Sequence, residues 1–356
     1  MGWDEIKKMP AAGLREELRA LLAKEAEYAH APPRPPPANP QGAVEEEPGV
    51  PNRGDRRLAA IRQQVCQWNY DTVDYFLVSR EVVHLSMNYF DRYLAARQGK
   101  EGGPLTAKMS HLLALASLYL ACKCQGATAA SDCSQDDVRL RLKDFCKMSG
   151  GAYSPRMIEG MELTLLAALR WRLHPPTPTD FLYRFAKLLW LSSQDSDDDD
   201  EDDQQPHGQD DALTEGEDAG GDGGWSAFEL ARYQIELAAY SPQLCQACPP
   251  SVVALAAVLN ATDSRLAGTD RVALPPRVRR AFLRRLRRLG EGFGGDRMEA
   301  AVQRAQVVLK TLCPETIALP RPEAESVASP LEYELSKDQS LVDESISPVG
   351  VDSDCL

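Results

Sequence analysis

Residues 81–94 read EVVHLSMNYFDRYL, and this stretch decides the fold class. Its apolar side chains recur three or four residues apart, at Val83, Met87, Phe90 and Leu94. That spacing predicts an α-helix with a wide apolar face. Asp91 interrupts the aromatic part of this face, and a charge in such a place needs a partner or it costs stability. The stretch therefore predicts a packed helical core in which Asp91 is paired.

Helical spacing continues on both sides of this stretch, and no segment from 56 to 191 shows the alternation of a strand. Ser154 and Pro155 are typical of an N-cap and a first helical position, and Ser226 with Glu229 predicts a capping box. We expect helices over 12–29, 56–77, 81–94, 109–122, 136–147, 155–172, 180–191, 226–240, 250–263, 275–289 and 296–312.

Two of these segments are apolar on all sides, which is typical of a helix at the centre of a bundle. Residues 109–122 contain no formally charged residue, and 251–261 read SVVALAAVLNA. We therefore expect an all-α chain with two helical units. Its predicted parts are an N-terminal helix and Pro-rich linker (1–55), a first unit (56–191), an acidic insert (192–224), a second unit (225–313) and a Pro/Glu/Ser-rich tail (314–356). The insert and the tail are expected to be disordered.

The net charge of −13 is concentrated in one place. Residues 194–224 hold 14 acidic residues and no Lys or Arg, so the rest of the chain carries +1. A near-neutral remainder makes nucleic-acid binding unlikely. No run of eighteen uncharged apolar residues is present, so no membrane span is expected.

Nine cysteines with irregular spacing indicate reduced thiols. Cys245-x-x-Cys248 is a lone pair, whereas a structural zinc site needs four ligands, so no metal is expected. The sequence contains no glycine-rich phosphate loop, no HExxH motif and no Ser-His-Asp arrangement. We therefore expect no cofactor and no catalytic residues.

Three stretches carry a resemblance to one family. They resemble the cyclin box, and their sequence is similar to that of cyclins of diatoms and related microalgae. The stretches are SREVVHLSMNYFDRYLA at 79–95, LLALASLYLACK at 112–123 and YSPRMIEGMELTLLAALRWRLHPPTPTDFL at 153–182. The segment 225–313 is similar to a C-terminal cyclin fold. The resemblance implies two tandem five-helix cyclin folds, separated by the acidic insert.

The family's five box positions match residues of this chain. The resemblance implies that Arg62 and Asp91 pair between two helices and that Leu112 is structural. It also implies that Lys123 and Glu162 bind a cyclin-dependent protein kinase. A local structural ion pair is the alternative interpretation for Lys123 and Glu162.

A substrate-docking patch of the family matches residues Ile61, Val65, Trp68 and Asp71. Gln64 and Ser110 replace apolar residues of that patch. Because polar walls weaken an apolar groove, we expect weak docking of substrates that bear an Arg-x-Leu motif.

The resemblance implies a regulatory subunit that binds and activates a cyclin-dependent Ser/Thr kinase in cell-cycle control, in the nucleus and cytoplasm. Two alternatives stay open. One is a cyclin-fold transcription factor of the TFIIB type, although no cysteine precedes Cys66 to form that family's zinc ribbon. The other is a helical scaffold without a kinase partner. Ser329 and Ser347 precede proline in the tail and are candidate phosphorylation sites.

Residues 277–289, RVRRAFLRRLRRL, hold seven Arg in thirteen positions. The simplest interpretation is a surface helix of the second unit. The alternative is a face that binds acidic partners, among them the chain's own acidic insert.

Overall fold

The computed structural model describes residues 1–28, 53–98, 105–128, 141–194, 222–263, 275–289, 293 and 296–313. These residues form helices and contain no strand, which confirms the all-α prediction for the part described. The helices are α1 (Trp3–Lys8), α2 (Leu14–Tyr28), α3 (Arg53–Tyr75), α4 (Glu81–Gln98), α5 (Ala107–Thr128), α6 (Leu142–Met148), α7 (Pro155–Ala168), α8 (Pro178–Ser193), α9 (Asp222–Ala238), α10 (Pro242–Ala247), α11 (Pro250–Ala261), α12 (Pro276–Arg287) and α13 (Asp296–Leu312).

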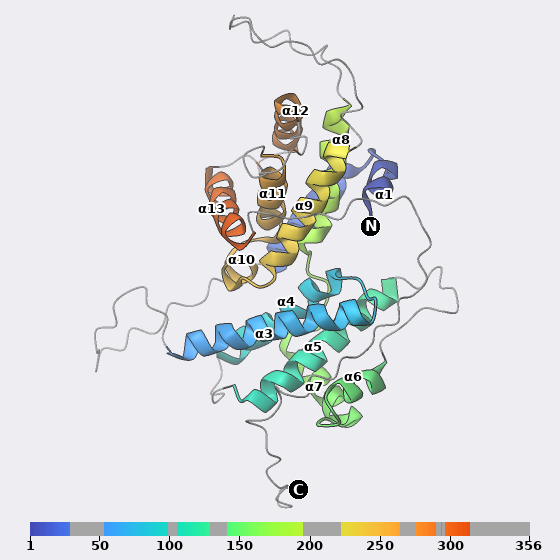
Figure 1. The fold of residues 1–356 in the computed structure, drawn as a ribbon, viewed down its shortest axis with the longest axis vertical. Coiled ribbons are helices and arrows are strands. Elements are labelled where there is room, and N and C mark those ends of the chain that lie inside the picture. The colour runs from blue at the N-terminus through green and yellow to red at the C-terminus, as the bar shows by residue number, and fades with distance from the viewer. Residues whose placement is uncertain are drawn as a thin grey trace, which may run out of the picture. The chain divides into compact units, whose positions relative to one another are not determined.

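The first hydrophobic core is built by α3 to α7. Helix α5 contacts α3, α4, α6 and α7 (Figure 1). Its buried side chains include Leu113, Leu115 and Leu118, none of which is accessible to solvent. A helix without an apolar stripe thus lies where its sequence predicted, among the other helices of its core.

The second hydrophobic core has an equivalent central helix. Helix α11 contacts α2, α8, α9 and α13, and nine of its 12 residues are buried. Glu25 of α2 accepts hydrogen bonds from the backbone nitrogen and the hydroxyl of Ser251, each at 2.7 Å. Since these groups lie in the first turn of α11, Glu25 satisfies donors that the helix itself leaves unpaired.

Helix α8 packs in the second core, although the sequence grouped it with the first unit. Its contacts are with α1, α2, α9, α11 and α12. The Phe185 ring of α8 lies 6.5 Å from the Phe282 ring of α12, measured between centroids. The segment HPPTPT separates α7 from α8, so that α8 is free to join a different core.

Three local predictions differ from the structure. Helix α7 ends at Ala168 rather than 172, because Arg170 and Trp171 adopt positive φ of 52° and 59°. Helix α9 begins at Asp222, which places Ser226 inside the helix rather than at its cap. The short helices α1 and α10 were not predicted. Trp3 and Ile6 of α1 are buried in the second core.

Several predictions fall outside the described residues. These are the Pro-rich linker over 29–52, most of the acidic insert and the tail from 314. That the second core is a second cyclin fold also remains a prediction, as do the domain boundaries. No helix in the described ranges combines the length and apolar content that crossing a membrane requires.

Candidate functional site

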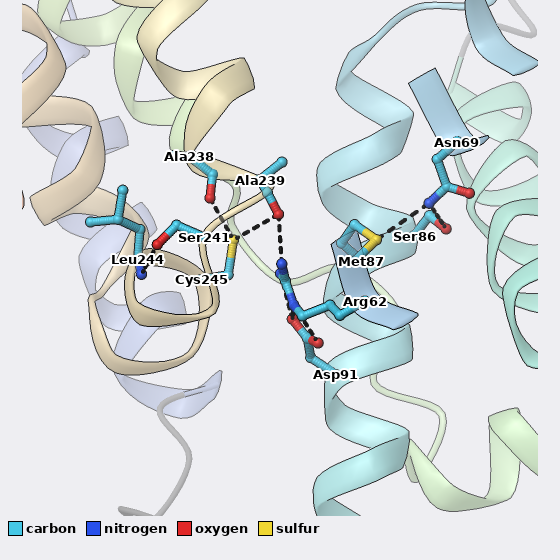
Figure 2. A network of polar contacts seen from close by, with 10 residues as sticks. All are labelled: Arg62, Asn69, Ser86, Met87, Asp91, Ala238, Ala239, Ser241, Leu244 and Cys245. Atoms are coloured by element: carbon cyan, nitrogen blue, oxygen red, sulfur yellow. Dashed lines mark hydrogen bonds and ion pairs between the residues drawn. The ribbon is translucent and has the colours of Figure 1, made fainter. Parts of the chain in front are cut away.

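Arg62 of α3 and Asp91 of α4 form a salt bridge, as Figure 2 shows. Nε of Arg62 donates to Oδ1 at 2.9 Å, and Nη2 donates to Oδ2 at 2.9 Å. The Arg62 side chain is 2% exposed and that of Asp91 is 10% exposed. Asn69 adds a second polar contact between the same helices, donating to Ser86 Oγ at 3.1 Å. The structure therefore brings together the two residues that the family resemblance pairs.

The same guanidinium reaches the residue that follows α9 (Figure 2). Nη1 of Arg62 donates to the Ala239 carbonyl at 2.8 Å. Cys245 Sγ donates to the Ala238 carbonyl at 3.2 Å, beside this contact. Burial alone would lower the pKa of Arg62, but the charge of Asp91, its hydrogen bond and the nearby thiols of Cys245 and Cys66 together raise the pKa above its ordinary value. Arg62 therefore stays charged and binds Asp91 of α4 and the Ala239 carbonyl after α9 at the same time.

Further contacts join α3 and the loop before α4 to the end of α9. Tyr70 Oη donates to the Glu236 carbonyl at 3.0 Å, and Tyr240 Oη donates to Gln67 Oε1 at 2.9 Å. The rings of Tyr70 and Tyr240 stack with centroids 5.6 Å apart. Arg80 forms an ion pair with Glu236. These contacts were not predicted from the sequence. Two of the acceptors, the carbonyls of Glu236 and Ala239, are backbone groups that no side-chain pattern indicates.

Lys123 and Glu162 meet on the surface of the first core. Lys123 Nζ lies 2.5 Å from Glu162 Oε1, with side-chain exposures of 51% and 9%. The Lys123 ammonium also lies 5.0 Å from the centre of the Tyr119 ring. Burial lowers the pKa of Lys123, but its hydrogen bond to Glu162 and the charges around it together raise the pKa above its ordinary value. Lys123 thus stays charged, is paired within the chain and is accessible to a partner.

Two apolar side chains are exposed on α7, the helix that carries Glu162. Leu163 is 63% exposed and Met157 is 40% exposed. We call Lys123, Glu162, Met157 and Leu163 the α5–α7 surface. Exposed apolar side chains on a helix that also contributes to an ordered charge pair are typical of a protein-binding surface.

Leu112 is half-buried against the first core. Of the predicted docking patch, Val65 is buried, Ile61 and Trp68 are half-buried, and Asp71 is exposed. Asp71 accepts a hydrogen bond from Gln67 at 2.8 Å. The Trp68 ring meets the His111 ring edge-on, with centroids 6.5 Å apart. Much of the patch is therefore used for packing within the chain.

Other predicted sites have different outcomes. Within the described ranges, no group of three or more His, Cys, Asp or Glu side chains is placed to hold a metal ion. Ser329 and Ser347 lie outside the residues that the structure describes.

Comparison with known proteins matches residues 49–174 to the family "Cyclin, N-terminal domain". The matched range contains Arg62, Asp91, Leu112, Lys123 and Glu162. Cyclin-D3-3 of Arabidopsis thaliana is 30% identical over 129 residues, which cover 36% of this chain and 32% of that protein. Cyclin-I2 of Homo sapiens is 32% identical over 130 residues, covering 36% and 31%. G1/S-specific cyclin-E1 of Rattus norvegicus is 25% identical over 134 residues, covering 38% and 29%. The chain thus spans about a third of the length of these relatives.

Two solved structures are similar at low identity. A viral cyclin from herpesvirus saimiri has a TM-score of 0.45 and 16% identity, covering 72% of this chain and 86% of its own. The CAK complex of Chaetomium thermophilum bound to ATP-gamma-S has a TM-score of 0.46 and 15% identity, covering 87% and 77%. The family match rests instead on residues 49–174 and on the cyclins that align with them. Residues 49–174 of this chain are therefore similar to the N-terminal domain of cyclins, and this range contributes most of the first core.

Proposed function

We propose that this chain is a regulatory subunit that binds and activates a cyclin-dependent Ser/Thr protein kinase. The observation that carries the proposal is the α5–α7 surface, which combines the Lys123–Glu162 pair with exposed Leu163 on the helix that carries Glu162. An ordered charge pair gives orientation, and the apolar side chains give area to bury. The similarity of residues 49–174 to the N-terminal domain of cyclins supports the choice of a kinase as the partner.

The chain acts by positioning rather than by chemistry of its own. Its α5–α7 surface binds the C-helix of the kinase and holds that helix inward. The kinase Glu then pairs with the Lys that binds ATP, an arrangement that phosphoryl transfer requires. The reacting groups all belong to the kinase, and the proposed locations for this complex are the nucleus and cytoplasm.

Complex formation tests the binding half of the proposal. Purified full-length chain and a purified cyclin-dependent kinase are mixed and analysed by size-exclusion chromatography and calorimetry. The variant Leu163→Glu introduces a charge into the proposed interface. We expect its affinity to fall at least tenfold, a loss of about 1.4 kcal/mol or more in binding free energy.

The chain offers a matched control. Val307 of α13 is 62% exposed, close to the 63% of Leu163, but it lies on the second core. Val307→Glu should leave the affinity for the kinase unchanged. Equal losses in both variants, or no complex with the unmodified chain, would reject the proposed interface.

A further inference from the structure

Helix α12 presents one apolar and one strongly basic face. Val278, Ala281, Phe282 and Leu286 are buried in the second core or against it. The opposite side carries arginines that are exposed to solvent, among them Arg280, Arg287 and Arg288. We call these three residues the α12 arginine face. Because positive charges lie close together on one side of the helix, the face favours a polyanionic ligand.

The chain itself contains a polyanionic segment that follows α8 in the sequence. Residues 195–203 hold eight acidic side chains in nine positions, and the acidic run begins directly after Gln194 at the end of α8. Helix α8 packs against α12 (Figure 1). The Phe185 and Phe282 rings join the two helices, with centroids 6.5 Å apart. The acidic run therefore follows directly after a helix that packs against α12.

The lengths involved allow the contact. Nine residues of extended chain reach up to about 30 Å, whereas the 12 residues of α12 extend over about 18 Å. A short tether of this kind gives an effective concentration in the millimolar range. A contact with a dissociation constant well below about 1 mM would then be formed most of the time.

We propose that the acidic segment 195–221 binds the α12 arginine face of the same chain and competes there with external polyanions. The attraction is electrostatic and the α12 arginine face is exposed, so the contact weakens as salt rises. This inference does not depend on the kinase partner, because α12 belongs to the second core and the α5–α7 surface to the first.

A labelled peptide tests the proposal directly. The probe is a fluorescent synthetic peptide with the sequence of residues 194–218, and its binding is followed by fluorescence anisotropy. It is added to the full-length chain and to a full-length variant in which a Gly/Ser linker of equal length replaces 195–221. We expect at least tenfold tighter binding to the linker variant, since its α12 arginine face has lost the tethered competitor. The affinity should fall steeply as salt is raised.

Two sets of substitutions locate the binding site. In the linker variant, Arg280→Gln, Arg287→Gln and Arg288→Gln together should weaken peptide binding at least tenfold, and Gln keeps the helix propensity. The matched control removes three exposed arginines elsewhere, at Arg15, Arg19 and Arg156, and should have little effect. Circular dichroism verifies that each variant keeps its helical content.

Each contrary outcome overturns the proposal. Equal peptide affinity for the unmodified chain and the linker variant would mean that the acidic segment does not occupy the face. The absence of peptide binding to the linker variant would mean that the face accepts other ligands or none. A dimer of the unmodified chain that dissociates in the linker variant would show that the segment binds a second copy instead.

Discussion

Arg62 of α3 binds the carboxylate of Asp91 in α4 and, through its remaining nitrogen, the Ala239 carbonyl at the end of α9. One buried cation therefore joins two helices of the first core to a residue that follows the second-core helix α9. Asp91 neutralises the cation and accepts from Nε and Nη2. The Ala239 carbonyl accepts from Nη1, the nitrogen that does not bind Asp91. Removing one member leaves a charge or a donor without its partner inside the protein.

Asp91→Ala should lower the free energy of unfolding by about 3–5 kcal/mol, because it leaves Arg62 buried and uncompensated. Chemical denaturation measures this change. The control is Asp74→Ala, which breaks the salt bridge to Arg80 between side chains that are 44% and 48% exposed. It should cost less than about 1 kcal/mol. Similar losses in the two variants would contradict a special role for Arg62 and Asp91.

Glu25→Ala should destabilise the protein by about 1–3 kcal/mol, because the first turn of α11 loses a charged acceptor at Ser251. Thermal and chemical unfolding measure the loss. Glu16→Ala provides the comparison, since Glu16 lies on the same helix α2 and is exposed. A loss of stability at Glu16 as large as at Glu25 would argue against the capping role.

Stability should fall as the pH is lowered from about 7 to about 4.5, and His84 should account for part of the fall. Burial, assisted by the Arg62 charge, lowers the pKa of His84 to about 4. The unfolded chain takes up a proton near the ordinary pKa of about 6.5, whereas the folded chain resists it. Acid therefore favours unfolding, and the contribution of His84 is lost between these two pKa values. The expected loss by about pH 4.5 is about 2–3 kcal/mol.

His84→Leu should remove that part of the pH dependence. The unfolding free energy is measured at both pH values for the unmodified chain and the variant. His174→Leu is the control, because His174 is exposed and should leave the pH dependence as it was. If His84→Leu and the unmodified chain lose the same stability on acidification, His84 is not the group responsible.

The elements that dominate the fold follow from the sequence because their patterns are local. The uncharged run at 109–122 and the apolar run at 251–261 each predict a central helix, and α5 and α11 take those places. Ser154 predicts the start of α7, and its side chain accepts a hydrogen bond from the Met157 nitrogen at 3.4 Å. A cap and a periodicity are properties of a few neighbouring residues.

The parts that could not be predicted depend on tertiary contacts. Arg62 uses the Ala239 carbonyl as an acceptor, and every residue carries such a carbonyl, so the sequence gives no signal for it. Helix α8 follows α7 in sequence yet packs against α12. Because its apolar side chains would suit either core, the sequence does not indicate which core it joins. Helix α1 has six residues, too few for periodicity to be read, and is held by burial of Trp3 and Ile6.

Activation of a kinase through the α5–α7 surface is proposed, and the turnover of histone by a purified cyclin-dependent kinase tests it. The rate is measured with and without this chain. The unmodified chain should raise the rate at least tenfold, and Lys123→Ala with Glu162→Ala should abolish most of that increase. The matched control is Arg232→Ala with Glu229→Ala, a pair on α9 at 2.6 Å with similar exposures of 45% and 11%. This control variant should activate the kinase as strongly as the unmodified chain does. Equal activation by both double variants, or no activation by the unmodified chain, would contradict activation through the α5–α7 surface.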